Sequence, residues 1–253
     1  MQKVDKEQYS KFIEFARENT CNTVYPMAIA EGFQDGDIFT DCIEHPTFAL
    51  FWHVSGLAYL TGRPVVEHLE EIYRLMKNED GTNPRRFVLE LKDEEGRAYF
   101  QKKEEVEEHT RYRFRLQEKE MPEEELPEGY ELREVNAELS TKISGNIVPA
   151  SFWRSDADFL EKGRGYCIMY GDEIASVAFS AAISSEQVDI GIETAEAHRR
   201  KGLAVIAAKK MVAYVKSIHK EPVWDCNVAN VGSRRTAENV GFEIMTEHAL
   251  YKI

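Results

Sequence analysis

A mixed α+β fold is predicted by three features of the sequence. The 253-residue chain is 43% hydrophobic and 30% charged, which is typical of a soluble globular protein with one large or two small domains. In the second half, a helical pattern between two strand patterns favours parallel pairing, while tight turns favour antiparallel hairpins. An acidic stretch with two prolines, at residues 118–129, divides the chain. We therefore expect an N-terminal module at 1–120, a linker at 121–129 and a C-terminal domain at 130–253.

The first half has the patterns of a smaller α+β module. Helices are expected at Lys6–Arg17 and Val65–Met76, because apolar residues recur there at helical intervals. Short apolar or alternating runs predict strands at Ile38–Ile43, Thr47–Tyr59, Arg86–Leu91 and Arg111–Leu116. The alternating arginines of the last run are interpreted as a solvated strand face, with an anion site as the alternative.

The second half gives a clearer order of elements. A strand at Tyr130–Val135 precedes helical segments within Asn136–Glu161, where Ser155 suits an N-cap. The remaining expected elements are strands at Tyr166–Tyr170, Ile174–Ile183 and Val188–Thr194, a helix from Leu203 to about Ile218, a strand at Val223–Val228, a helix at Val231–Val240 and strands within Phe242–Ile253. A mixed, mostly antiparallel sheet follows from this order.

Composition excludes several classes of function. The net charge of −13 argues against a nucleic-acid binder, which needs a basic face. No run of about 18 uncharged apolar residues predicts a membrane span, and no signal peptide is visible, so we expect a cytoplasmic protein. The cysteines are dispersed and the histidines lack ligand spacing, so no metal is expected.

The segment Ile190–Ala204 carries the strongest chemical signal. A strand ends at Thr194, and a basic loop leads to Gly202, where the next helix opens. The N–H groups of a first helical turn have no helical partners, and the helix dipole favours anions there. With Arg199, Arg200 and Lys201 alongside, the loop is suited to a pyrophosphate, although a solvated basic turn is the alternative.

Further motifs surround this loop. Arg199-x-x-Gly202-x-Ala204 is followed by Asn230 and Ser233 at the opening of a short helix, and then by a Gly-Phe pair. These motifs resemble those of the GNAT acetyltransferase family, in particular a two-part branch that includes zwittermicin-resistance-type enzymes. The resemblance covers Tyr130–Ile253 well. It implies a GNAT-like fold with a splayed central sheet in the second half, and the first half is interpreted as a smaller module that could be a degenerate half-copy.

The resemblance also implies acetyl-CoA as co-substrate. Edge amides at Ile192 and Thr194 are expected to bond the pantetheine arm like an added strand. The loop is expected to hold the diphosphate through Arg199, Arg200, Lys201, Gly202, Leu203 and Ala204. Asn230 and Ser233 are assigned either to the cofactor or to an ordinary N-cap.

Candidate catalytic residues lie on the neighbouring strands. Glu193 is the first candidate base and Asp189 the second, while an exposed strand carboxylate is the alternative for each. Many members of the family carry a tyrosine seven residues after the asparagine, but Ala237 stands there. Cys226 or Ser233, or water, is considered as the proton donor to the leaving thiolate, or the thiolate leaves unassisted.

The predicted function is acetyl transfer from acetyl-CoA to a primary amine of a small molecule, in a ternary complex. The negative charge favours a cationic acceptor such as a polyamine or aminopolyol, and the branch resemblance points to amine-bearing antibiotics. No nucleic acid or membrane partner is expected, and a homodimer is considered. The alternatives are a non-catalytic coenzyme A-binding or regulatory module and a protein-interaction role for the first half.

Overall fold

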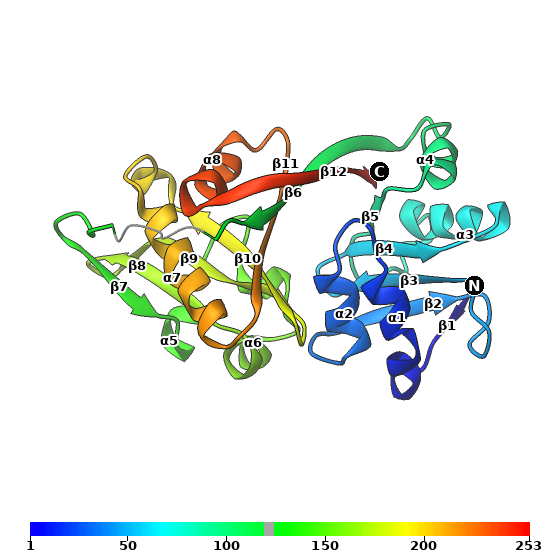
Figure 1. Cartoon of the computed structure of the whole chain (residues 1–253), viewed down its shortest axis with the longest axis horizontal. Coiled ribbons are helices and arrows are strands. Elements are labelled where there is room, and N and C mark those ends of the chain that lie inside the picture. Colours follow the sequence, from blue (N-terminus) through cyan, green and yellow to red (C-terminus); the bar gives the residue numbers. More distant parts are fainter. Residues whose placement is uncertain (119–123) are drawn as a thin grey trace. The chain divides into compact units, whose positions relative to one another are not determined.

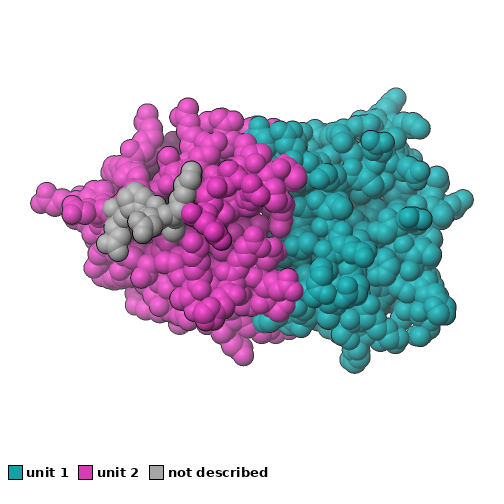
Figure 2. All heavy atoms as spheres, viewed as in Figure 1, with its two compact units in different colours: residues 1–112, 247–253 teal, residues 113–246 magenta. Residues whose placement is uncertain are grey.

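The structure, a computed structural model, describes residues 1–118 and 124–253. The chain divides into two compact units (Figure 2). Unit 1 comprises Met1–Tyr112 and Glu247–Ile253, and unit 2 comprises Arg113–Thr246. The linker expected at 121–129 falls partly on residues 119–123, which lie outside the described residues, and the domain boundary placed there stays a prediction.

Unit 1 combines strands and helices (Figure 1). Its elements, in chain order, are β1 (Gln2–Lys3), a 3-10 helix (Lys6–Phe12), α1 (Ile13–Arg17), α2 (Val24–Ala30), β2 (Gly36–Thr40), β3 (Phe48–His53), β4 (Leu57–Gly62), α3 (Val66–Lys77), β5 (Val88–Leu91), α4 (Glu94–Phe100), the start of β6 (Glu107–Leu116) and the end of β12 (Phe242–Lys252). Along the sheet, β1 to β4 pair antiparallel in turn, and β5 pairs parallel with β4 and antiparallel with the end of β12.

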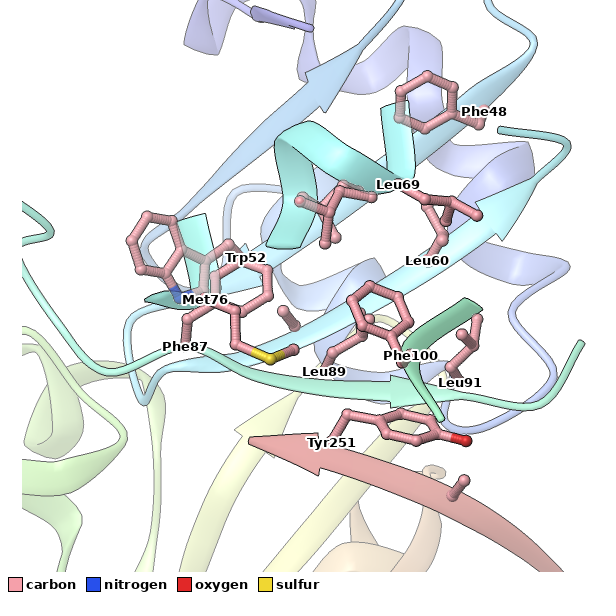
Figure 3. Packing of buried hydrophobic residues seen from close by; sticks show 14 residues of the cluster. Phe48, Trp52, Leu60, Leu69, Met76, Phe87, Leu89, Leu91, Phe100 and Tyr251 are labelled. Carbon is pink, nitrogen blue, oxygen red and sulfur yellow. The ribbon is translucent and has the colours of Figure 1, made fainter. Parts of the chain in front are cut away.

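The core of unit 1 brings α3 and α4 together with the sheet. Buried residues Leu69, Ile72 and Met76 lie three and four positions apart on α3, so they share one helix face. Each large apolar side chain buried in this way stabilises the fold by about 1.5–3 kcal/mol. Figure 3 shows the cluster that they form with Phe48, Trp52, Leu60, Phe87, Leu89, Leu91, Phe100 and Tyr251.

Unit 2 contains the elements on which the predicted site depends. After the end of β6, and before the start of β12, come β7 (Tyr130–Glu134), α5 (Ala137–Ser140), a 3-10 helix (Pro149–Ser151), α6 (Asp156–Lys162), β8 (Gly165–Tyr170), β9 (Glu173–Ile183), β10 (Gln187–Thr194), a 3-10 helix (Glu196–His198), α7 (Leu203–Ser217), β11 (Glu221–Asn227) and α8 (Val231–Val240).

Helix α7 covers the middle of the unit 2 sheet. It lies across β8, β9 and β10 (Figure 1), and its buried residues include Leu203, Ala207, Met211 and Val215. Because these four recur every fourth residue, they form one apolar stripe along the helix. The packing of this stripe fixes the first turn of α7 close to the end of β10.

The two units repeat one order of elements. Apart from the 3-10 helices, each runs strand, two helices, three strands, helix, strand, helix, strand. In each, the first four strands pair antiparallel in turn and the fifth pairs parallel with the fourth. Strands β6 and β12 each begin in one unit and end in the other. This repetition supports the interpretation of the first half as a degenerate copy.

The mixed α+β class and the mostly antiparallel sheet are confirmed, but some elements differ from prediction. The single strand predicted at Thr47–Tyr59 is wrong: the chain turns after β3, and Gly56, with φ of 88°, begins the return into β4. The helix predicted at Lys6–Arg17 is a 3-10 helix followed by α1. Helix α2 was not predicted because all seven of its residues are buried, which removes the one-sided pattern.

The arginines of β6 also correct a prediction. The side chain of Arg113 is 9% exposed, and its Nη1 lies 3.5 Å from Oδ2 of Asp225. Arg111 places Nε 3.3 Å from Oε1 of the buried Glu90. A solvated face is therefore wrong for both, because other strands of the fold supply carboxylates that the pattern of one strand cannot reveal. No helix in the described part of the chain has the length and apolar character needed to cross a membrane.

Candidate active site

The sheet of unit 2 opens along one edge of β10. Within residues 1–118 and 124–253, strand β11 pairs with β10 only at Gln187–Asp189, in parallel. In the same part of the chain, the rest of β10, from Ile190 to Thr194, continues its antiparallel pairing with β9 alone. The predicted splay is thus present, and it begins after Asp189, the last residue of β10 that pairs with β11. Ile192 and Thr194, the residues expected to bind the pantetheine arm, both lie in the splayed part of the strand.

The end of β10 is held in place by side chains. The Ser176 hydroxyl lies 2.8 Å from the Thr194 hydroxyl and donates to the Glu193 carbonyl at 3.2 Å. Arg199 donates from Nε to the Thr194 carbonyl oxygen at 3.2 Å. The Arg199 side chain therefore turns back onto the strand, and Thr194 offers its carbonyl to this arginine in the present structure.

The loop after β10 presents unpaired backbone donors. Within the described residues, the N–H groups of 200–204 have no hydrogen-bond acceptor, and the regular helical bonds begin after them. Arg200 and Gly202 adopt left-handed conformations, with φ of 64° and 79°. Successive donors in such turns form concave anion sites, and the dipole of α7 adds partial positive charge. The geometry therefore fits the diphosphate group that the sequence predicted.

Gly202 is required by its backbone conformation more than by crowding. Among the residues that the structure describes, a Cβ atom built on it would meet one atom, Oε2 of Glu124, at 4.0 Å. The other oxygen of that carboxylate accepts from Nζ of Lys209 at 2.7 Å. A side chain at position 202 would thus have room, but it would sit at the mouth of the anion cradle.

A network that the sequence did not reveal anchors the basic loop. Lys201 donates from Nζ to the Tyr130 hydroxyl at 2.8 Å, and that hydroxyl lies 2.7 Å from Nδ1 of His198. Because an ammonium group can only donate, the phenol oxygen accepts from Lys201. Nε2 of the buried His198 lies 3.3 Å from Oε2 of Glu173. The partners are up to 71 residues apart, so no local motif could have indicated them.

Glu193 is engaged by a loop of the same unit. Its Oε2 accepts the backbone N–H groups of Asn146 at 3.0 Å and Ile147 at 2.9 Å. Asp189 lies four residues earlier on the same strand, about 13 Å away at the usual rise per residue, and is 6% exposed. The two candidate bases therefore cannot act on one proton, and Glu193 is the one that lies in the splayed stretch.

The remaining predicted residues have structural partners. Asn230 accepts the N–H of Ser233 at 3.0 Å and so caps α8, while the Ser233 hydroxyl accepts from Nε1 of Trp224 at 3.1 Å. Cys226 is 4% exposed and Ala237 is fully buried. The catalytic and binding roles of Asn230, Ser233 and Cys226 stay predictions.

Comparison with known proteins identifies the family. A family model described as GNAT acetyltransferase matches residues 14–251. The uncharacterized N-acetyltransferase YdfB of Bacillus subtilis (strain 168) is 22% identical over 256 residues, covering 99% of this chain and 98% of that protein. The uncharacterized N-acetyltransferase YjdG of the same organism is 38% identical over 69 residues, 26% of this chain and 40% of that protein.

Solved structures share the fold along the chain. A GCN5-related N-acetyltransferase-like protein from Streptococcus suis 89/1591 superposes with a TM-score of 0.76 at 20% identity, covering 98% of this chain and 99% of that one. A tandem GNAT protein from the clavulanic acid biosynthesis pathway gives 0.62 at 10% identity, covering 97% and 93%. Because the family model spans nearly the whole sequence and this fold accompanies it, the chain belongs to the GNAT acetyltransferase family and is an acetyltransferase.

Proposed function

We propose that this acetyltransferase takes the acetyl group from acetyl-CoA and transfers it to a primary amine of a small molecule in a ternary complex. The observation that carries the proposal is the row of unpaired N–H groups at 200–204, directly after the open edge of β10. Proteins of the GNAT family generally use acetyl-CoA. Domain 130–253 holds all the residues that we assign to this chemistry.

The chain's own groups suit a positioning mechanism. The loop donors would hold the diphosphate, and the backbone of Ile192 and Thr194 would bond the pantetheine arm along the splay. Acetyl-CoA supplies the acetyl group as a thioester. Alignment of two bound reactants can contribute about 7–11 kcal/mol to catalysis in favourable cases, so the demand on side chains is modest.

Proton transfer would fall to Glu193. The attacking amine must lose a proton as its C–N bond forms and the C–S bond breaks, and this carboxylate lies in the open stretch of β10. Asp189 remains the second candidate. Cys226, Ser233 or water could protonate the leaving thiolate, or the thiolate could leave unassisted. The Cys226 thiol is buried, whereas the Ser233 hydroxyl accepts from Trp224 and keeps its own proton to donate.

The acceptor is proposed to be cationic. A net charge of −13 attracts amines over long range, which suits a polyamine, an aminopolyol or an amine-bearing antibiotic of the kind suggested by the zwittermicin-resistance-type branch. We also propose a homodimer, which a measurement of the oligomeric state in solution would test. Membership of an acetyltransferase family does not favour the alternative of a non-catalytic module.

One experiment tests the proposal. Acetyl-CoA is titrated into the protein by calorimetry, and a panel of polyamines, aminopolyols and aminoglycoside-type amines is then added while release of free thiol is followed. Binding with turnover supports the proposal. Binding without turnover across the panel would restore the non-catalytic alternative, and absence of binding would remove both.

A further inference from the structure

One carboxylate oxygen of Glu193 accepts hydrogen bonds from two consecutive backbone N–H groups in the loop after α5. Residues 144–147 of this loop are exposed, so apolar burial does little to hold them. Hydrogen bonds to an ionised carboxylate are roughly twice as strong as those between neutral groups. The pair of bonds from Asn146 and Ile147 is therefore the main attachment of the loop to β10.

Gly145 shows that the loop is built around this carboxylate. Its φ of 135° lies in the region that favours glycine. A Cβ at this position would lie 2.6 Å from Cγ of Glu193 and 2.9 Å from Cδ, closer than real atoms approach. The absence of a side chain thus lets the backbone come near enough for both N–H groups to reach Oε2. Backbone conformation and hydrogen bonding give two separate indications of the same contact.

We propose that Glu193 is a positioning residue that fixes Gly145–Ile147 beside the open end of β10, where the loop forms one wall of the acceptor site. This inference rests on the proposed function, which delivers the acetyl group along that edge. Ile147 is 39% exposed, so the wall offers an aliphatic surface and suits an amine carried on a hydrocarbon segment. Oε2 holds the loop, and a proton from the amine would be taken by Oε1.

Hydrogen exchange without any ligand tests the attachment. In the wild type, the amides of Asn146 and Ile147 should exchange slowly for exposed loop residues. Glu193→Ala should speed their exchange by about tenfold or more, because the one oxygen that accepts both N–H groups is lost. Glu193→Gln should restore protection, since its amide oxygen can still accept, and Glu161→Ala on α6 should change nothing. Unchanged exchange in Glu193→Ala overturns the proposal.

Gly145→Ala tests the function of the loop with Glu193 intact. The added Cβ should push the loop from the carboxylate, so the same two amides should lose protection. For the best amine of the panel, KM should rise about tenfold relative to the wild type. Gly171→Ala is the control, because Gly171 also has positive φ (58°) but no atom of the described residues within 4 Å of a Cβ.

The two proposals fail in different ways. If the wild-type protein does not bind acetyl-CoA in the calorimetric titration, the proposed function is wrong. The hydrogen-exchange measurement uses no ligand, so its result does not depend on acetyl-CoA binding. An unchanged KM for Gly145→Ala in an active enzyme, or unaltered exchange at the two amides, would show that the loop is not a wall positioned by Glu193.

Discussion

The backbone conformations of Arg200 and Gly202 shape the loop between β10 and α7. Both lie in the left-handed region, which costs a residue other than glycine about 1 kcal/mol or more. Such a cost at Arg200 persists only where surrounding structure enforces it, and here the enforced turn coincides with the unpaired N–H groups. Strain and unused donors at one position are a combination typical of ligand sites.

An isosteric pair at position 202 separates charge from strain. Asparagine and aspartate have the same shape, and both tolerate left-handed φ better than most residues. We expect Gly202→Asp to weaken acetyl-CoA binding at least about tenfold more than Gly202→Asn, because only the former places a negative charge in the diphosphate site. The Kd of acetyl-CoA for each variant is measured by calorimetry. Equal affinities for the two variants would show that the loop at Gly202 does not bind the diphosphate.

At the scale of elements, variants of Asn230 at the start of helix α8 show whether this residue is a helix cap, a ligand contact or both. Its side chain accepts the N–H of Ser233, so Asn230→Ala should lower the free energy of unfolding by about 1 kcal/mol, and Asn230→Asp should retain it. Chemical denaturation measures this effect. If Asn230→Ala left stability unchanged, the capping role would be wrong, and weaker acetyl-CoA binding by both variants would add a cofactor role.

Elements with a one-sided apolar pattern could be predicted from sequence, and elements buried all round could not. Helices α3 and α7 were predicted because their apolar stripes recur at helical spacing. Helix α2 has no polar face, and the turn between β3 and β4 interrupts an apolar run with a few residues only. Their structure depends on tertiary contacts that local periodicity does not encode.

The same division applies to the site. The strand, basic loop and helix around Gly202 are contiguous, so their order in the sequence was enough to predict an anion cradle. The carboxylate of Glu193 meets amides 46 and 47 residues away, and Tyr130 meets His198 across 68 residues. These contacts arise only when loops and strands are brought together by the fold, and no spacing rule predicts them.

At the scale of the whole molecule, His53 should make stability depend on pH. Burial, helped by the nearby Arg85 charge, lowers the pKa of His53 from 6.5 to about 3. Between these values the unfolded chain binds a proton that the folded state does not, so stability falls as the pH falls, by up to about 1.4 kcal/mol per pH unit. Unfolding of His53→Gln should show a shallower pH slope, whereas the exposed His45→Gln should keep that of the wild type.

The repeated topology raises the question of how many acetyl-CoA molecules one chain binds. In unit 2, residues 195–202 connect β10 to α7, but in unit 1 only residues 63–65 connect β4 to α3. The edge of β4 beyond its pairing with β5 is also occupied. Asn19 donates from Nδ2 to the Leu60 carbonyl at 3.2 Å and to the Thr61 hydroxyl at 2.9 Å. Unit 1 therefore lacks both the loop for a diphosphate and a free edge for the pantetheine arm.

We expect calorimetry to give one acetyl-CoA per chain in the wild type and none at the same concentrations in Gly202→Asp. Asn19→Ala should leave the number at one, because removing the amide frees the edge of β4 but does not lengthen the short connection after Gly62. A second binding event that survives Gly202→Asp would contradict this prediction. It would mean that the first copy of the fold has kept a cofactor site by contacts other than those that serve the second copy.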